Sequence, residues 1–222
     1  MRLLAIDTSG PLCSAALLLD GDLTERVQLA PRRHAELILP MMDALLHEAG
    51  AALADLDALA YGHGPGSFTG VRIAAAVVQG AAFGAGLPVI GISTLAALAQ
   101  GAWRLHGVRQ VLCAQDARMG EVYWGAYQLD EHDIMRSWDR DRVGAPDRVQ
   151  RPDGEEVWAG AGSGWQVHAE LLAAAVGAVR PLPLEHCHAR DVAALAAEGG
   201  GVSAQNALPV YLRERVAEPP RH

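Results

Sequence analysis

Gly64-Pro65-Gly66-Ser67-Phe68-Thr69-Gly70-Val71-Arg72 is the stretch that decides the fold of this chain. An apolar run precedes it, from Leu56 to Tyr61, and a long segment of small residues follows it, from Ile73 to Ala85. This order is typical of a strand, a glycine-rich turn and the N-terminus of a helix. The amides of a first helical turn are unpaired and can hold an anion, which makes Gly64, Gly66, Ser67 and Thr69 candidate phosphate-binding residues. A purely structural turn needs the same glycines, so both interpretations stay open.

The N-terminus carries a second pattern of this kind. An apolar run ends in Asp7-Thr8-Ser9-Gly10, and another follows, from Cys13 to Leu19, which predicts a β-hairpin with a carboxylate and two hydroxyls at its tip. The tip resembles that of phosphotransferases of the actin, hexokinase and Hsp70 superfamily, in which it faces the nucleotide phosphates and the Asp orients a metal-bound water. Asp7 and Ser9 are therefore further candidates for phosphate contacts. Alternatively, both side chains only form the bonds to backbone that tight turns favour.

Six segments together resemble one protein family, and they stand in the expected order. They are Leu3 to Thr8, His34 before Leu39-Pro40, Gly62 to Arg72, Gly91 to Leu95, Asp116 to Tyr123, and Pro209 to Arg213. The chain is similar to the TsaB family, the bacterial accessory subunits for threonylcarbamoyladenosine biosynthesis on transfer RNA. The resemblance runs from residue 1 to about residue 216 and is weak between Asp130 and Arg190.

The resemblance implies an α/β fold of two actin-like, ribonuclease H-like lobes, with residues 1–105 in the first lobe and 106–222 in a smaller, degenerate second lobe. It implies a non-catalytic, cytoplasmic scaffold that binds the catalytic subunit TsaD, with the ATPase TsaE as third partner. Such a scaffold supports transfer of a threonylcarbamoyl group to N6 of adenosine 37 in ANN-decoding transfer RNAs, with which it has only an indirect relation. It has no cofactor of its own, and ATP and a metal are bound by its partners. The alternatives are an ATP-dependent small-molecule kinase of the same superfold and a peptidase that acts on its partner.

Composition agrees with a soluble protein that has a proper core. The 222 residues suffice for one large or two small domains. We expect no signal segment, because Asp7 interrupts the first apolar run early, and no stretch of the ~20 apolar residues that would span a membrane. The three cysteines are far apart and odd in number, which favours reduced, buried thiols over a disulfide framework.

All 18 cationic residues are arginine. The lack of lysine excludes a Walker A phosphate loop, a Schiff-base mechanism and a lysine nucleophile. The formal net charge of −8 argues against strong independent binding of nucleic acid, since phosphate neutralisation dominates such affinity. Arg213 and Arg215 form a basic patch only in a weak sense, and we expect both side chains to be solvated.

Strands and helices alternate along the first half of the chain, which predicts an α/β layer structure. The expected strands cover 3–6, 14–19, 23–29, 56–61 and 88–92, and the expected helices cover 34–49, 71–85 and 94–103. The second half opens on a similar hairpin, 110–114 with 121–129, and is irregular from 130 to 156. A strand at 157–159 and helices near 166–176 and 189–198 complete it. Two similar hairpins suit a duplicated fold.

Two of the expected helices, 34–49 and 71–85, carry wide apolar surfaces. Between Val71 and Phe83 only Arg72 and Gln79 are polar, and a helix that is apolar all round is buried all round. Packing within one chain is one explanation. The other is a helix–helix interface with TsaD, or with a second copy of this chain in a homodimer, and the resemblance implies the same surface. The candidate interface residues are Leu37, Met41, Leu45, Val71, Ala74, Ala75 and Val78.

The metal-binding pattern of the catalytic relative is incomplete in this chain. TsaD holds a metal through a His-x-x-x-His pair, but here His34 stands at the first position and Ile38 at the second. We therefore expect His34 to cap a helix or form a hydrogen bond. We expect no metal site at His186-Cys187-His188 either, because adjacent side chains point apart.

Nucleotide-binding and nucleophile patterns are incomplete as well. Asp116 could stand at a second phosphate motif, and Gly160 to Gly164 has the place, but an ambiguous pattern, of an adenosine motif. Ser9, Ser67 and Cys13 cannot be paired with a His and an acid, so we predict no catalytic residues.

Overall fold

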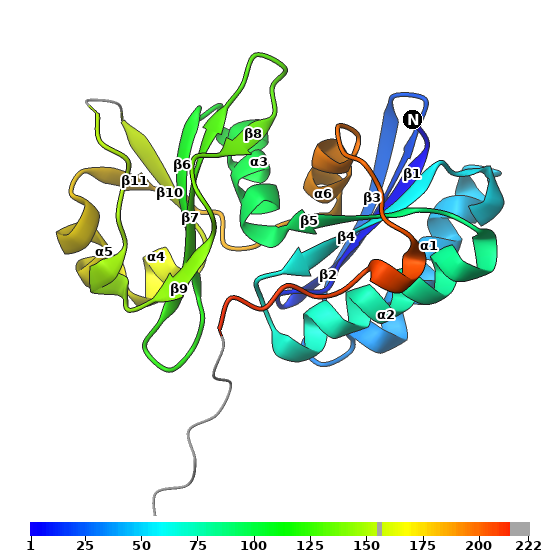
Figure 1. Ribbon diagram of the computed structural model, residues 1–222, viewed down its shortest axis with the longest axis horizontal. Helices are drawn as coiled ribbons and strands as arrows, with labels where there is room; N and C mark the ends of the chain where they lie inside the picture. Colours follow the sequence, from blue (N-terminus) through cyan, green and yellow to red (C-terminus); the bar gives the residue numbers. More distant parts are fainter. Residues whose placement is uncertain (155–156, 214–222) are drawn as a thin grey trace, which may run out of the picture.

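The computed structural model describes residues 1–154 and 157–213, which form a five-stranded sheet and a six-stranded sheet side by side (Figure 1). The first sheet consists of β1 (Leu3–Asp7), β2 (Leu12–Leu19), β3 (Asp22–Leu29), β4 (Ala58–Gly64) and β5 (Val89–Ser93). Its order is β3-β2-β1-β4-β5, with antiparallel pairs among the first three strands and parallel pairs from β1 to β5. All five residues of β1 are buried, whereas the edge strand β3 is polar and largely exposed.

The second sheet repeats this topology. It consists of β6 (Gln110–Asp116), β7 (Val122–Leu129), β8 (Met135–Ser137), β9 (Arg142–Gly144), β10 (Trp158–Ala161) and β11 (Val179–Pro181). Its order is β11-β10-β6-β7-β8, so an antiparallel series again continues through two parallel strands, here β10 and β11. We call the layers around the two sheets the first and second lobes. The expected α/β fold of two actin-like lobes is confirmed.

Several elements differ from the sequence-based expectation. β8, β9 and the short 3-10 helix η2 (Pro146–Arg148) lie in the segment that was expected to be irregular, and β11 was not expected. These strands have three residues each, too few for an alternating pattern to be recognised. The helix expected near 166–176 is split at His168 into α4 (Gly164–Val167) and α5 (Ala169–Val176).

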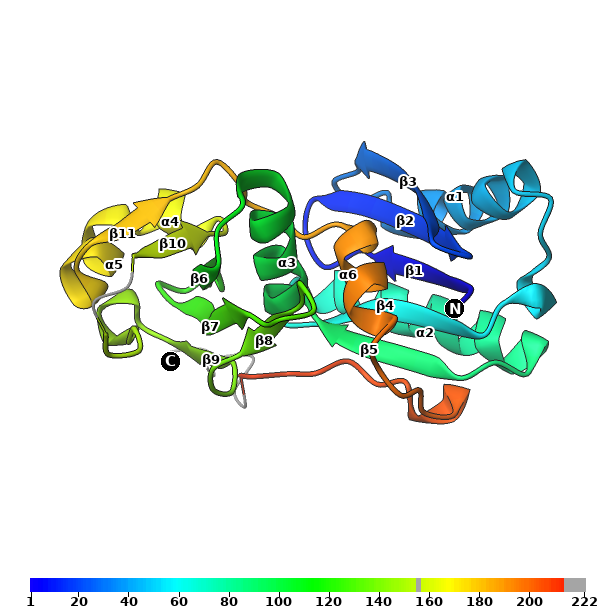
Figure 2. The ribbon, with the colours of Figure 1, turned by 90° about the horizontal axis from the view of Figure 1, so that it is seen from above.

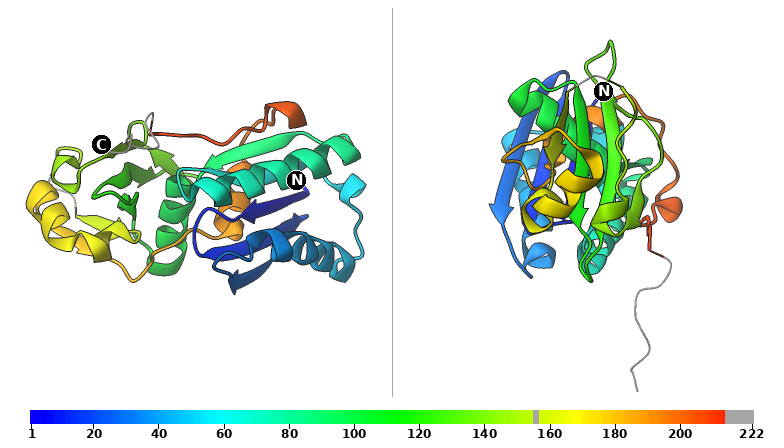
Figure 3. Two further views of the ribbon diagram at one scale, coloured as in Figure 1. Left: turned by 90° about the horizontal axis from the view of Figure 1, so that it is seen from below. Right: turned by 90° about the vertical axis from the view of Figure 1, so that its left-hand side faces the viewer.

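Helices cover the first sheet on both faces. α1 (His34–Glu48) and α2 (Phe68–Ala85) lie on one face and α6 (Ala189–Ala196) on the other (Figures 2 and 3). α3 (Thr94–His106) lies between the two sheets. α6 follows the second sheet in the chain but packs on β1 and β2, and Arg104 of α3 holds Asp191 of α6 through bonds of 2.7 and 2.8 Å. The chain thus returns to the first lobe at α6. The expected division into residues 1–105 and 106–222 does not include this return.

α2 is the longest helix that the structure describes. By length and composition alone it could cross a membrane, but it packs on the first sheet through Gly70, Val71, Ala74, Ala75, Val78 and Ala82. It begins at Phe68, before the expected Val71, because Ser67 caps it, and it ends at Gly86, whose φ of 70° suits glycine. Two further 3-10 helices, η1 (Leu53–Asp55) and η3 (Ala204–Asn206), flank the layers.

Candidate functional site

The β1–β2 turn and the glycine-rich loop are in direct backbone contact. The amide of Ser67 donates to the carbonyl of Ser9 at 2.8 Å. A Cβ at Gly66 would lie 2.7 Å from that carbonyl oxygen, and one at Gly70 would lie 2.0 Å from the oxygen of Thr8. The two sequence patterns therefore form one structure, and glycine is required because the backbones approach so closely.

The start of the loop is covered by the C-terminal segment. Gly64 has a φ of 116°, which favours glycine, and a Cβ there would lie 2.8 Å from the carbonyl oxygen of Val210. The Gly64–Pro65 peptide bond is cis, and the hydroxyl of Thr94 in α3 donates to the carbonyl of Pro65. The loop is thus enclosed by three separate parts of the chain.

The end of the loop starts α2. The hydroxyl of Ser67 accepts from the amide of Gly70 at 3.4 Å, which is the N-cap contact of a helix. The side chains of Ser67 and Thr69 are exposed. Three amides of the loop, those of Ser67, Gly70 and Val71, are hydrogen-bonded within the chain. An anion would have to use other amides or displace these bonds.

Asp7 lies in the interior, not at an exposed hairpin tip. Its side chain is 1% exposed, and its Oδ2 accepts from the amide and the hydroxyl of Ser9 at 3.3 and 3.1 Å. Its Oδ1 is buried without a hydrogen-bond partner among the described residues, and a Cβ at Gly62 would lie 2.2 Å from it. Burial raises the pKa of Asp7 from 3.8 to about 6, against the hydrogen bonds from Ser9. Asp7 therefore forms the side-chain-to-backbone bond that tight turns favour, which is the structural interpretation of this residue.

The thiols near this turn are protonated at neutral pH. Cys187 Sγ lies 3.7 Å from the hydroxyl of Ser9, and burial raises the pKa of Cys187 well above its ordinary value. Burial also raises the pKa of Cys13 to about 11. A cysteine nucleophile acts as a thiolate, so neither thiol is activated.

Two histidines of the first lobe and its neighbourhood, His34 and His188, lie beside oxygen atoms. His34 Nε2 lies 3.2 Å from the carbonyl oxygen of Leu12, which confirms the hydrogen-bonding interpretation of His34. His188 Nδ1 lies 3.5 Å from a carboxylate oxygen of Glu25, whereas the ring of His186 lies by the β1–β2 turn. Over residues 1–154 and 157–213, no three His, Cys, Asp or Glu side chains are placed to hold a metal ion.

The glycine turn of the second lobe is closely packed. A Cβ at Gly160 would lie 2.5 Å from the ring of Trp165, and one at Gly162 would lie 2.2 Å from the carbonyl oxygen of Ala114. Asp116 stands at the end of β6, and its amide donates to a hydroxyl in this turn at 3.1 Å. These glycines thus bring the turn against β6 and admit an indole ring.

The predicted interface residues lie mostly inside the chain. The buried ones, at most 4% exposed, are Leu45, Val71, Ala74, Ala75 and Val78. Their prediction as an outer contact surface is wrong, because both helices turn these positions inward. Four of them belong to one hydrophobic cluster of the first lobe, namely Leu45, Ala74, Ala75 and Val78. Leu37 and Met41 are half-buried and line a shallow groove against β3.

A different stripe of α2 faces outward. Its half-buried or exposed members are Thr69, Ile73, Ala76, Val77, Gly80 and Gly84. We call these six residues the outer face of α2. A Cβ at Gly80 or Gly84 would meet nothing within 4 Å, so the face is open at these two positions. Ile73 and Val77 are half-buried and pack in part against the core, and the face as a whole is mainly apolar. Helical spacing in the sequence groups these residues on one stripe of α2. Only the position of the sheet decides whether that stripe or the opposite one is buried.

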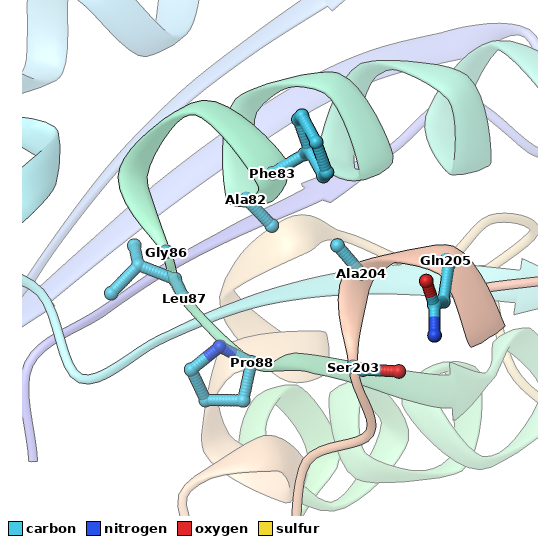
Figure 4. Close-up of a pocket in the computed structure, with 8 residues that line it drawn as sticks. All are labelled: Ala82, Phe83, Gly86, Leu87, Pro88, Ser203, Ala204 and Gln205. Atoms are coloured by element: carbon cyan, nitrogen blue, oxygen red, sulfur yellow. The ribbon is translucent and has the colours of Figure 1, made fainter.

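An open groove adjoins the C-terminal end of α2 (Figure 4). It has a volume of about 530 Å³ and lies between α2, the connection from α2 to β5, and η3. Phe83, which is 82% exposed, stands at its border, and Ala82 and Ala204 contribute methyl groups. The groove therefore extends the apolar surface beside the outer face of α2.

Arg213 is not the solvated side chain that we expected. Its guanidinium pairs with the carboxylate of Glu121, donates to the carbonyl of Ala117 at 3.1 Å, and leaves the side chain 16% exposed. No local pattern indicates this contact, because the partners are more than 90 residues apart. Arg215 lies outside the described residues.

Comparison with known proteins identifies the family. The model of the family "TsaD: tRNA N6-adenosine threonylcarbamoyltransferase" matches residues 28–220. The chain is 46% identical to the Escherichia coli tRNA threonylcarbamoyladenosine biosynthesis protein TsaB over 225 aligned positions, which cover 98% of this chain and 96% of that protein.

Two solved structures from Pseudomonas aeruginosa resemble the whole chain. One is YeaZ, with 48% identity, a TM-score of 0.88, and coverage of 95% of this chain and 99% of that one. The other is described as an uncharacterized protein similar to the peptidase YEAZ, with 47% identity, a TM-score of 0.89, and coverage of 96% and 99%. From this full-length similarity, the chain belongs to the TsaB family, within the wider family that the TsaD model describes.

Proposed function

We propose that this chain is a non-catalytic, cytoplasmic scaffold that binds TsaD and supports threonylcarbamoyl transfer to N6 of adenosine 37 in ANN-decoding transfer RNAs. The near full-length identity of 46% to a protein named for this biosynthesis supports the pathway. TsaE is the third partner, transfer RNA is reached through the partners, and ATP and a metal are bound by them. The chain itself uses no cofactor.

The outer face of α2 is the single observation that carries the docking proposal. Exposed small residues, above all Gly80 and Gly84, allow the backbone of a partner helix to approach closely. Phe83 and the adjoining groove add a large apolar side chain and a hollow at one end. TsaD occupies this face, and a second copy of the chain occupies it in a homodimer when TsaD is absent.

The burial of Asp7 and of the thiols near the β1–β2 turn supports the proposal that the chain is not itself a catalyst. A kinase of this superfold would need the Asp7 carboxylate open to a metal-bound nucleotide, whereas Asp7 is 1% exposed. A peptidase would need an activated nucleophile, and the Cys13 and Cys187 thiols are buried with raised pKa values.

Substitution of Ala76 by Arg tests the docking face. Ala76 is exposed, so Ala76→Arg leaves the core intact but places a charge in the proposed interface. We expect TsaD binding, measured by titration calorimetry and gel filtration, to weaken at least about tenfold. The matched control is Ala174→Arg on the exposed face of α5, which should bind as the unmodified chain does.

The outcomes are distinguishable. If Ala76→Arg folds and binds TsaD with unchanged affinity, the outer face of α2 is not the docking surface. If the unmodified chain itself fails to bind purified TsaD, the scaffold proposal fails. Ala75 and Val78 are unsuitable for this test, because their burial would make an Arg substitution unfold the chain.

A further inference from the structure

The segment 207–213 runs from η3 along α2 and ends on the second lobe (Figures 1 and 3). Hydrogen bonds of 2.8 to 2.9 Å hold its backbone to the first lobe, from Gln79 to Ala207, from Tyr61 to Leu208, and between Val210 and His63. These bonds come from α2 and β4, so the segment follows the first lobe closely.

Tyr211 fixes the segment to the first turn of α2. The Nε of Arg72 donates to the Tyr211 hydroxyl at 2.7 Å. The Arg72 guanidinium also lies 3.5 Å from the centre of the Phe68 ring, and the Phe68 and Tyr211 rings are 5.9 Å apart. Cation–π contact and ring packing therefore hold the hydrogen-bonding geometry in place.

Two residues further on, Arg213 contacts the turn between β6 and β7. This turn contains Arg118 and Met119 with φ values of 62° and 57°, a region that non-glycine residues adopt at a cost. The Arg213 guanidinium donates to the carbonyl of Ala117 and pairs with Glu121, the residues that flank the turn. A charged donor on both flanks stabilises the turn in this conformation.

We propose that residues 207–213 form a latch that fixes the orientation of the two lobes, with Arg72–Tyr211 as one anchor and Arg213–Glu121 as the other. The lobes also meet at the N-terminus of α3, where the hydroxyl of its capping residue Ser93 donates to Asp141 at 2.6 Å. α3 and α6 also join the lobes through one hydrophobic cluster that contains residues of both sheets. The latch adds a polar connection to this contact, at the β6–β7 turn. Through the latch, the stability of the β6–β7 turn depends on the Arg72–Tyr211 hydrogen bond in the other lobe.

Hydrogen exchange of the full chain, read by mass spectrometry, tests the latch without any partner. Tyr211→Phe removes only the hydroxyl that Arg72 reaches and keeps the ring. We expect amide exchange in 117–121 to become about fivefold faster, as for the loss of one hydrogen bond that stabilises the closed state. Arg213→Gln, which removes the second anchor, should have a larger effect on the same peptide.

Arg136→Gln is the matched control, since Arg136 forms a 2.7 Å ion pair with Asp130 on the same lobe, away from the latch. It should leave exchange in 117–121 unchanged. If Arg213→Gln accelerates this exchange and Tyr211→Phe does not, Arg213 acts only locally and the latch is refuted. If Arg213→Gln fails to fold, Tyr211→Phe alone decides. Unchanged amide exchange in 117–121 of that variant then refutes the latch.

Discussion

The hydroxyl of Thr8 donates a 2.7 Å hydrogen bond to the carbonyl of Gly70, across 62 positions of sequence. Thr8 is fully buried in the β1–β2 turn, and Gly70 lies in the first turn of α2. Together with the bond from Ser67 to Ser9, it fixes the start of α2 to the centre of the first sheet. The direction of the helix, and hence of its outer face, is therefore set by the hairpin turn.

Thr8→Val should destabilise the chain by about 1 kcal/mol, because it removes this hydrogen bond at nearly constant volume. Urea denaturation measures the effect. Thr69→Val is the control, since Thr69 is exposed one residue from Gly70 and should change the free energy of unfolding little. Equal effects of the two substitutions would show that the Thr8 bond contributes nothing specific.

Two glycines of α2 should respond to alanine with opposite signs. Gly70→Ala places a methyl group 2.0 Å from the oxygen of Thr8 and should cost about 3 kcal/mol or more. Gly80→Ala meets nothing within 4 Å and should stabilise the isolated chain by about 0.5–1 kcal/mol through helix propensity. Thermal denaturation measures the change in stability of both variants. A Gly70→Ala protein as stable as the unmodified chain would contradict the close contact between the β1–β2 turn and α2.

Asp7 should make stability depend on pH. The pKa of Asp7 rises from 3.8 to about 6 on folding, so the folded chain holds this proton more tightly than the unfolded chain. The free energy of unfolding should therefore fall as pH rises from about 4 to about 6, by up to about 3 kcal/mol from this residue. Asp7→Asn removes the titration, so the stability difference between Asp7→Asn and the unmodified chain should grow with pH over this range. A difference independent of pH would show that folding leaves the pKa of Asp7 unchanged.

ATP with magnesium should hardly stabilise the isolated chain. Stabilisation follows the logarithm of ligand concentration over Kd, so millimolar ATP should raise the melting temperature by less than about 1 °C if no nucleotide site exists. Gly66→Ala should lower the melting temperature by itself, since its Cβ would lie 2.7 Å from Ser9. A rise of many degrees at micromolar ATP, lost in Asp7→Asn, would favour the kinase alternative.

The first lobe could be predicted from the sequence almost strand by strand. Its strands and helices are long enough for their periods to be recognised, and the nine residues from Gly64 to Arg72 marked the junction of β4 and α2. The weakly patterned part of the second lobe could not be predicted in this way, because β8, β9 and β11 have three residues each.

The candidate site was less predictable than the fold. A helix that is apolar all round does not show which stripe meets the sheet, so Ala75 and Val78 were placed on the wrong side. The buried Asp7 has Cys187, 180 residues later, as a hydrogen-bonding neighbour, and the contact of Arg213 depends on a turn in the other lobe. Such long-range packing has no local signature in the chain.

A reconstituted transfer assay tests the central claim most directly. It contains TsaD, TsaE, a source of the threonylcarbamoyl adenylate and an ANN-decoding transfer RNA, with product measured by mass spectrometry of the nucleosides. We expect transfer to require this chain, to survive Asp7→Asn, and to fall with Ala76→Arg in proportion to lost TsaD binding. Transfer by this chain without TsaD, or loss of transfer in an Asp7→Asn variant that still binds TsaD, would contradict a non-catalytic scaffold.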